Sequence, residues 1–133
     1  MLNENDVVNI LIPYLAKNNW EIVSTCDTRT QGDDVVAKKE GNVFYIEVKG
    51  ATSSKTESSR YGLPFSSSQM RDHVAVAVLK ALQTRTRCQQ SSVGLAFADT
   101  PRHRTLFNSI FPCLKLLEID VFLIKENGEV ELL

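Results

Sequence analysis

Residues 32–50, GDDVVAKKEGNVFYIEVKG, contain two short apolar runs separated by the dipeptide Gly41-Asn42. Such a pair between two β-favouring runs predicts a β-hairpin with a two-residue turn. If Gly41 and Asn42 form the turn, Ala37 lies opposite Ile46 and Asp34 lies opposite Lys49. This hairpin is the starting point for predicting the fold and the function.

Side chains alternate between the two faces of a strand, so the hairpin separates its residues by chemistry. One face is apolar and carries Val35, Ala37, Phe44, Ile46 and Val48. The other face carries Asp34, Glu47 and Lys49 at the open end of the hairpin. A slip of one residue would place Asp34 beside Val48 on the apolar face, where an unpaired carboxylate is costly, so the pattern favours the stated faces.

The cluster of Asp34, Glu47 and Lys49 suits one kind of chemistry. Two neighbouring carboxylates, with a backbone carbonyl and waters, are ligands for a hard cation such as Mg²⁺, or Mn²⁺ in its place. A cation of this kind activates water and polarises a phosphoryl oxygen, and Lys49 on the same face can orient the water or neutralise charge in the transition state. The chemistry indicated is phosphodiester hydrolysis. The alternative is a surface salt bridge at a strand end, worth about 0 to 1 kcal/mol and without functional meaning.

Periodicity and turn signals predict the remaining elements, which together give a mixed α/β chain. Before the hairpin we expect a helix capped by Asn3 or Asn5 that runs toward Asn18 and is bent or split at Pro13, and then a strand from Trp20 to Cys26. After the hairpin we expect a loop over residues 50–68, a helix opened by the capping box Ser66 to Gln69, and an inner strand from Val93 to Ala98. The last elements are a helix from Leu106 to Leu117 interrupted by Pro112, and a hairpin of Val121 to Lys125 and Glu129 to Leu133 that turns at Asn127-Gly128.

In this order of elements the chain resembles the PD-(D/E)xK nucleases, the restriction-endonuclease-like superfamily that includes Holliday junction resolvases and many repair and defence nucleases. Gly32-Asp33-Asp34-Val35 matches the first part of the family motif, and Ile46-Glu47-Val48-Lys49-Gly50 matches the second; Asp33 stands in place of the proline.

The resemblance covers most of the chain. It implies an αβββαβ core with a mixed central sheet flanked by helices. It also implies Asp34 and Glu47 as metal ligands and Lys49 as the catalytic lysine. Two further residues match looser features of the family. Gln69 is a candidate catalytic residue at the start of the following helix, and its other interpretation is the capping-box partner of Ser66; Glu4 is a candidate for an additional acid from the first helix.

The middle of the chain is basic, since residues 50–104 carry eight Lys and Arg against three Asp and Glu. Lys55, Arg60 and Tyr61 lie in the loop that follows Lys49, where they are candidates for contacts with phosphates or bases. The other interpretation of this loop is a plain surface connection.

Outside the loop, His73 follows Gln69 by one helical turn and is expected to share its face, although such a histidine is more often structural. The arginines at 85, 87, 102 and 104 suit phosphate contacts or simple solubility. A zinc site from Cys26, Cys88, Cys113, His73 and His103 matches no usual spacing, so the cysteines are interpreted as buried packing residues.

Size and composition favour one domain spanning residues 1–133, with 43% hydrophobic residues and no apolar run long enough to cross a membrane. The acidic, polar N-terminus and three widely spaced cysteines fit a reducing cytoplasm.

We therefore expect a metal-dependent DNA endonuclease. Because one small domain carries one site, a homodimer is an expected arrangement for cutting a duplex. The alternatives are a binding module of the same fold without catalysis, for nucleic acid or for a protein, and a component that acts only with a partner protein in a larger repair or defence assembly.

Overall fold

The computed structural model describes residues 1–25, 33–59 and 61–133. The order of the helices and strands along the chain includes the expected αβββαβ core. The elements are α1 (Glu4–Lys17), β1 (Glu21–Thr25), β2 (Val35–Lys39), β3 (Asn42–Lys49), α2 (Ser67–Arg87), β4 (Ser92–Ala98), α3 (Pro101–Leu116), β5 (Ile119–Ile124) and β6 (Val130–Leu132).

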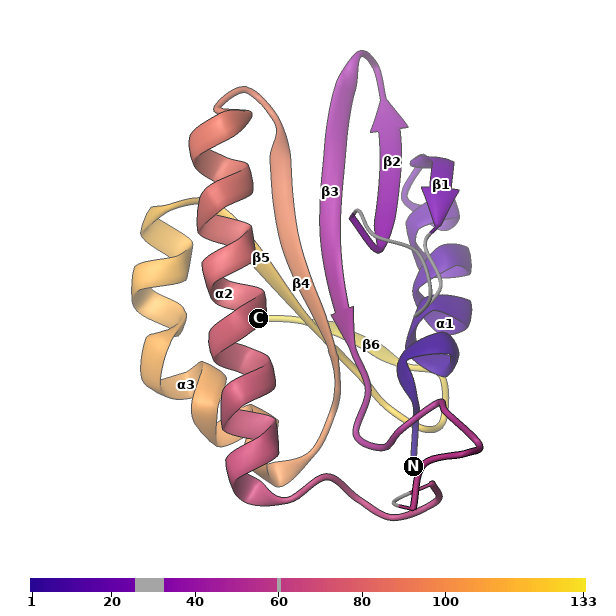
Figure 1. The fold of residues 1–133 in the computed structure, drawn as a ribbon. Helices are drawn as coiled ribbons and strands as arrows, with labels where there is room; N and C mark the ends of the chain where they lie inside the picture. The colour runs from indigo at the N-terminus through magenta and orange to yellow at the C-terminus, as the bar shows by residue number, and fades with distance from the viewer. Residues whose placement is uncertain (26–32, 60) are drawn as a thin grey trace.

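The six strands form one mixed sheet in which sequence order and spatial order coincide, β1-β2-β3-β4-β5-β6. The pairs β3–β4 and β4–β5 are parallel, and the three other pairs are antiparallel. In Figure 1 the sheet is seen nearly edge-on, with α1 on one face and α2 and α3 on the other. The predicted α/β fold with a mixed central sheet flanked by helices is confirmed.

Two apolar clusters hold these layers together. One joins α1 to the sheet face that includes Ile46 and Ala96, and the other joins α2 and α3 to the opposite face through Leu95 and Val121. Because β3 lies in the middle of the sheet, alternate residues of β3 face the two layers: Ile46 and Val48 face α1, whereas Glu47 and Lys49 face the side of α2.

The predicted hairpin is present, but its turn was placed one residue too late. Glu40 and Gly41 form the turn with positive φ angles of 50° and 83°, as a type I′ turn requires. Val35 pairs with Ile46 and Ala37 with Phe44, so the predicted pairs of Ala37 with Ile46 and Asp34 with Lys49 are wrong. The register differs by two residues, which leaves the faces unchanged, and its continuation by one residue places Asp34 level with Glu47.

Both prolines expected to interrupt helices lie inside continuous ones. Asn3 caps α1 in a capping box with Asp6, and the helix runs through the exposed Pro13 to Lys17. The third helix begins at Pro101, five residues before the predicted start, and runs through the exposed Pro112. Thr100 caps it by accepting the His103 N–H, with Pro101 at the first helical position where proline needs no partner. The buried faces on either side of each proline outweigh the lost hydrogen bond.

Two predicted elements need only small changes. The first strand is β1, Glu21–Thr25, and the part of the prediction at Cys26 lies outside the described residues. The C-terminal hairpin turns at Asn127-Gly128 as expected, with Gly128 at a φ of 89°. Within the described ranges, no helix is long and apolar enough to cross a membrane.

Candidate functional site

Asp34, immediately before β2, is fixed against the strand that carries Glu47 and Lys49. The backbone N–H of Val48 donates a hydrogen bond of 2.7 Å to Oδ2 of Asp34. Val48 is the residue between Glu47 and Lys49, so the three members of the predicted motif come together at one point of the sheet. The juxtaposition holds although the predicted pairing was off by two residues, because the side of the sheet was right.

Glu47 is the most unusual residue of this group, since it is a carboxylate with only 7% of its surface exposed. Its pKa is raised to about 7, mainly by burial between β3 and α2; the contact with Lys80 lowers it, the charge of Asp34 raises it and the charge of Lys49 lowers it. A carboxyl group with a pKa near neutrality exchanges a proton easily at physiological pH.

Lys80 is the direct partner of Glu47 and was missed in the sequence. Its Nζ lies 2.6 Å from Oε1 of Glu47. Lys80 is in the middle of α2, eleven residues after Gln69 and seven after His73, which puts the three on one helical flank. That spacing was the available signal, but the face could not be assigned to Glu47 without the packing of α2 on β3.

Glu4 lies in the first turn of α1 and is brought to the same place from the other layer. Burial raises its pKa, the charge of Lys49 lowers it, and that of Asp34 raises it, so Glu4 is electrostatically part of the group. Gly50 permits this approach. A Cβ on Gly50 would lie 2.5 Å from backbone atoms of Asn3 and Glu4, so only glycine lets α1 begin so close to the end of β3.

Gln69 forms the capping box, as one of its two interpretations predicted. Its Oε1 accepts the Ser66 N–H at 2.8 Å, and its own N–H donates to Oγ of Ser66 at 3.2 Å.

One helical turn after Gln69, His73 packs edge-on against Phe65 at 4.6 Å between ring centres. Burial lowers the pKa of His73, and so does the charge of Lys49. His73 therefore lies toward the site, as expected from its spacing.

The loop after β3 is tied at its base and exposed at its tip. The hydroxyl of Thr52 donates to the Leu63 carbonyl at 2.6 Å, and the Phe65 N–H donates to the Ala51 carbonyl at 2.9 Å. Beyond these ties, Lys55 is exposed and Tyr61 is 52% exposed. Arg60, the third predicted contact residue, lies outside the described residues. The two described side chains are thus accessible to a large ligand.

Two of the four dispersed arginines have structural roles. Arg85 donates to the carbonyls of Leu117, Glu118 and Ser91 and so fixes the end of α2 to its surroundings. Arg104 makes ion pairs with Asp99 and Glu131, both at 2.7 Å. Of the other two, Arg87 is exposed and Arg102 is half-buried.

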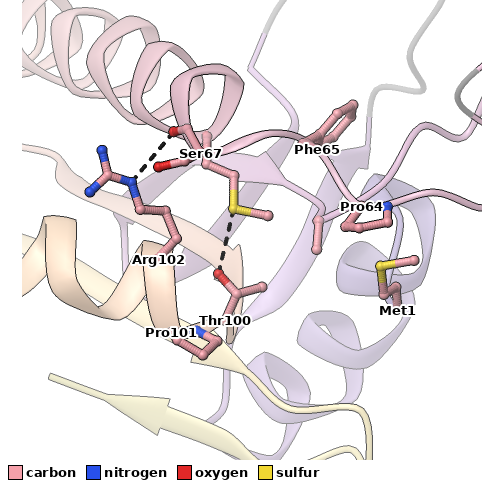
Figure 2. A pocket seen from close by; sticks show the side chains of 9 residues that line it. Met1, Pro64, Phe65, Ser67, Thr100, Pro101 and Arg102 are labelled. Atoms are coloured by element: carbon pink, nitrogen blue, oxygen red, sulfur yellow. Dashed lines mark hydrogen bonds between the residues drawn. The ribbon is translucent and has the colours of Figure 1, made fainter.

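An apolar hollow of about 380 Å³ lies at the carboxyl ends of the parallel strands. Figure 2 shows it between Phe65, Pro64 and Met1 on one side and Thr100, Pro101 and Arg102 on the other, with Nε of Arg102 hydrogen-bonded to the Ser67 carbonyl at 3.4 Å. No carboxylate is among the described residues that line it. The hollow is therefore separate from the carboxylate group.

Among residues 1–25, 33–59 and 61–133, no three His, Cys, Asp or Glu side chains converge as a metal cluster, a finding that applies to the carboxylates near β3 as well as to the cysteines and histidines. The expectation that the cysteines are buried is wrong for Cys113, which is exposed, while Cys88 is half-buried and Cys26 lies outside the described residues. A hard cation needs fewer protein ligands than zinc. Lys80 contacts Oε1 of Glu47 and the Val48 N–H donates to Oδ2 of Asp34, so one oxygen of each carboxylate is engaged within the protein.

Comparison with solved structures gives two similar chains. One is an XisH family protein from Nostoc punctiforme PCC 73102, with a TM-score of 0.54 and 20% identity over 96% of this chain and 95% of that one. The chain has the fold of an XisH family protein. The other is a fdxN element excision controlling factor protein from Anabaena variabilis, with a TM-score of 0.55 and 18% identity over 95% of this chain and 96% of that one. No protein-family model matches the sequence, and no curated protein matches it. The XisH-like fold spans nearly the whole of all three chains.

Proposed function

We propose that the protein is a metal-dependent nuclease of the PD-(D/E)xK type that hydrolyses DNA phosphodiester bonds. The observation that carries this proposal is the hydrogen bond from the Val48 N–H to Asp34, because it gathers Asp34, Glu47 and Lys49 at one end of the hairpin. DNA as the substrate is supported by the structural relative described as an excision controlling factor for the fdxN element.

Each residue of the group has a distinct role in this proposal. Asp34 and Glu47 would hold Mg²⁺ or Mn²⁺, which prefer carboxylate oxygens and keep several waters. The ion, when bound, supplies a polarised phosphoryl oxygen and a water of lowered pKa. Lys49 orients the attacking water and offsets the negative charge that develops on the phosphoryl group. Lys80 holds the buried Glu47 in place and favours its ionised form, which makes it a positioning residue.

The substrate reaches this group from the open end of the hairpin. Lys55 and Tyr61 at the tip of the 51–65 loop are exposed and are proposed to contact the phosphate backbone and the bases, with Arg60 beside them in the sequence. Phosphate contacts of this type fix the position of the duplex without reading its sequence.

A non-catalytic binding module on the same fold is the second candidate. The specific observation in its favour is the 2.6 Å contact between Lys80 and Glu47, since a lysine that already neutralises a carboxylate competes with a cation for it. In that case the group is a charge cluster that stabilises the contact of α2 with β3. A comparison of cleavage and binding by the same preparation separates the two functions, because the binding module retains DNA in the presence of Mg²⁺ or Mn²⁺ without producing fragments.

A further inference from the structure

The outer face of α2, which is directed away from the sheet, carries several exposed apolar side chains among polar ones. Its inner face, with Met70, Val74, Ala77 and Ala81, is buried as expected for an amphipathic helix. A second stripe runs along the opposite side, where Val76 is 61% exposed, Leu79 58% and Leu82 36%, with the exposed Ala75 beside them. A helix that is apolar on both faces is usually covered on both.

We infer that this outer stripe of α2 is the surface through which two copies of the chain pair, with the two α2 helices antiparallel and Leu79 on the two-fold axis. Such an interface uses the same patch twice, so the patch must be complementary to itself. With Leu79 facing Leu79, Val76 faces Leu82 of the second copy, and Ala75 faces Gln83. The stripe therefore closes upon itself with its large side chains paired.

The charges beside the stripe agree with this pairing. Asp72, which also contacts Arg71 of its own helix at 3.4 Å, is exposed one turn before Val76, and Arg87 is exposed at the end of α2. In the antiparallel arrangement position 72 faces position 86, so Asp72 of one copy comes beside Arg87 of the other at both ends of the interface. Parallel helices would instead bring like charges together, which is unfavourable.

The antiparallel arrangement also places the candidate sites of the two copies on the same side of the dimer. In an antiparallel pair the two-fold axis runs along the interface, perpendicular to both helices, so one flank of α2 lies on the same side of the pair in both copies. Lys80 and His73 occupy that flank. Both Glu47 groups then lie toward one side of the dimer, where a single duplex can contact them. The pairing itself stands without the nuclease proposal.

Helix pairs of this length bury less surface than most permanent dimers, so the dimer is expected to form and dissociate with concentration. Sedimentation velocity over a wide concentration range measures this directly. The unmodified chain should shift from monomer to dimer, and Leu79→Glu should weaken dimerisation roughly tenfold or more, because two carboxylates then meet on the axis. Leu116→Glu is the matched control, because Leu116 is 84% exposed but lies at the end of α3.

A charge exchange tests the register. Asp72→Arg alone should weaken the dimer, and Asp72→Arg combined with Arg87→Asp should restore it. An unmodified chain that stays monomeric at every concentration would overturn the inference and leave the stripe for a different protein. A Leu79→Glu variant, shown to be folded by circular dichroism, that dimerises like the unmodified chain would overturn it as well.

Discussion

The ammonium group of Lys80, in the middle of α2, lies 2.6 Å from Oε1 of Glu47 on the central strand β3. This contact couples the helix layer to the residue group at the end of the hairpin. It favours the charged form of a carboxylate at a position where burial opposes the charge.

Removal of the Lys80 charge should raise the pKa of Glu47 above its value of about 7, because Lys80 favours the ionised form. In Lys80→Met the proposed nuclease activity at neutral pH is therefore expected to fall and to recover in part as the pH is raised. A carboxyl ¹³C titration by NMR measures the pKa, and Lys17→Met, an exposed lysine in the last turn of α1, is the control. An unchanged Glu47 titration would show that Lys80 does not act on it in solution.

Asp34 has a structural role, as acceptor of the Val48 N–H, and a proposed role as a metal ligand, and two substitutions separate the two roles. Asp34→Asn keeps an oxygen that accepts the Val48 N–H, so the free energy of unfolding should change little while Mn²⁺ binding, measured by calorimetry, is lost. Asp34→Ala leaves that N–H without its partner and should cost about 1 to 3 kcal/mol in addition. Equal stability of the two variants would contradict the structural role of the hydrogen bond.

Glu47 makes the stability of the metal-free protein depend on pH. Its pKa in the fold is raised from 4.5 to about 7, so its contribution to stability is complete below pH 4.5 and is lost as the pH rises through 7. Glu47→Gln should therefore gain stability relative to the unmodified chain over this range, by on the order of 1 to 3 kcal/mol at pH 8. Chemical denaturation at several pH values gives the difference.

Addition of Mn²⁺ at pH 8 gives the complementary result. A ligand that binds only the folded state raises its stability, so the cation should stabilise the unmodified chain and leave Glu47→Gln unaffected. Equal stabilisation of both proteins would place the cation elsewhere.

His103 produces a loss of stability on the acid side. It is fully buried, its Nδ1 lies 2.8 Å from the Ala98 carbonyl, and burial lowers its pKa from 6.5. A lowered pKa means that its contribution is present above pH 6.5 and is lost as the pH falls below that value. His103→Asn, which can still donate to Ala98, should flatten this part of the profile. A variant whose stability falls as steeply as that of the unmodified chain between pH 6.5 and 5 would contradict this assignment.

The sequence was sufficient for the order of the elements and for the hairpin faces, because periodicity and turn residues are local signals. The predicted turn, Gly41-Asn42, lies one residue after the observed turn, Glu40-Gly41. A positive φ at a non-glycine residue, here Glu40, is not expected from the residue types alone. The assignment of side chains to the two faces of the hairpin was correct because the observed register differs from the predicted one by two residues. Asp34 could therefore be placed with Glu47 before the pairing was known.

What could not be predicted depends on contacts between layers. Lys80 is distant from Glu47 in the sequence, and only the packing of α2 on β3 brings them together. The same is true of Gly50, whose missing side chain makes room for the backbone of Asn3. Continuous helices through Pro13 and Pro112 also depend on burial of neighbouring residues, which outweighs local propensity.

The most direct test of the nuclease proposal is cleavage of plasmid, single-stranded and four-way-junction DNA with Mg²⁺ or Mn²⁺ by the unmodified chain and by Glu47→Gln. Products that require the cation and disappear in the variant are the predicted result. If neither protein cuts any of these substrates while both bind DNA, the nuclease proposal is contradicted, and Asp34, Glu47 and Lys49 are a charge cluster of a DNA-binding module.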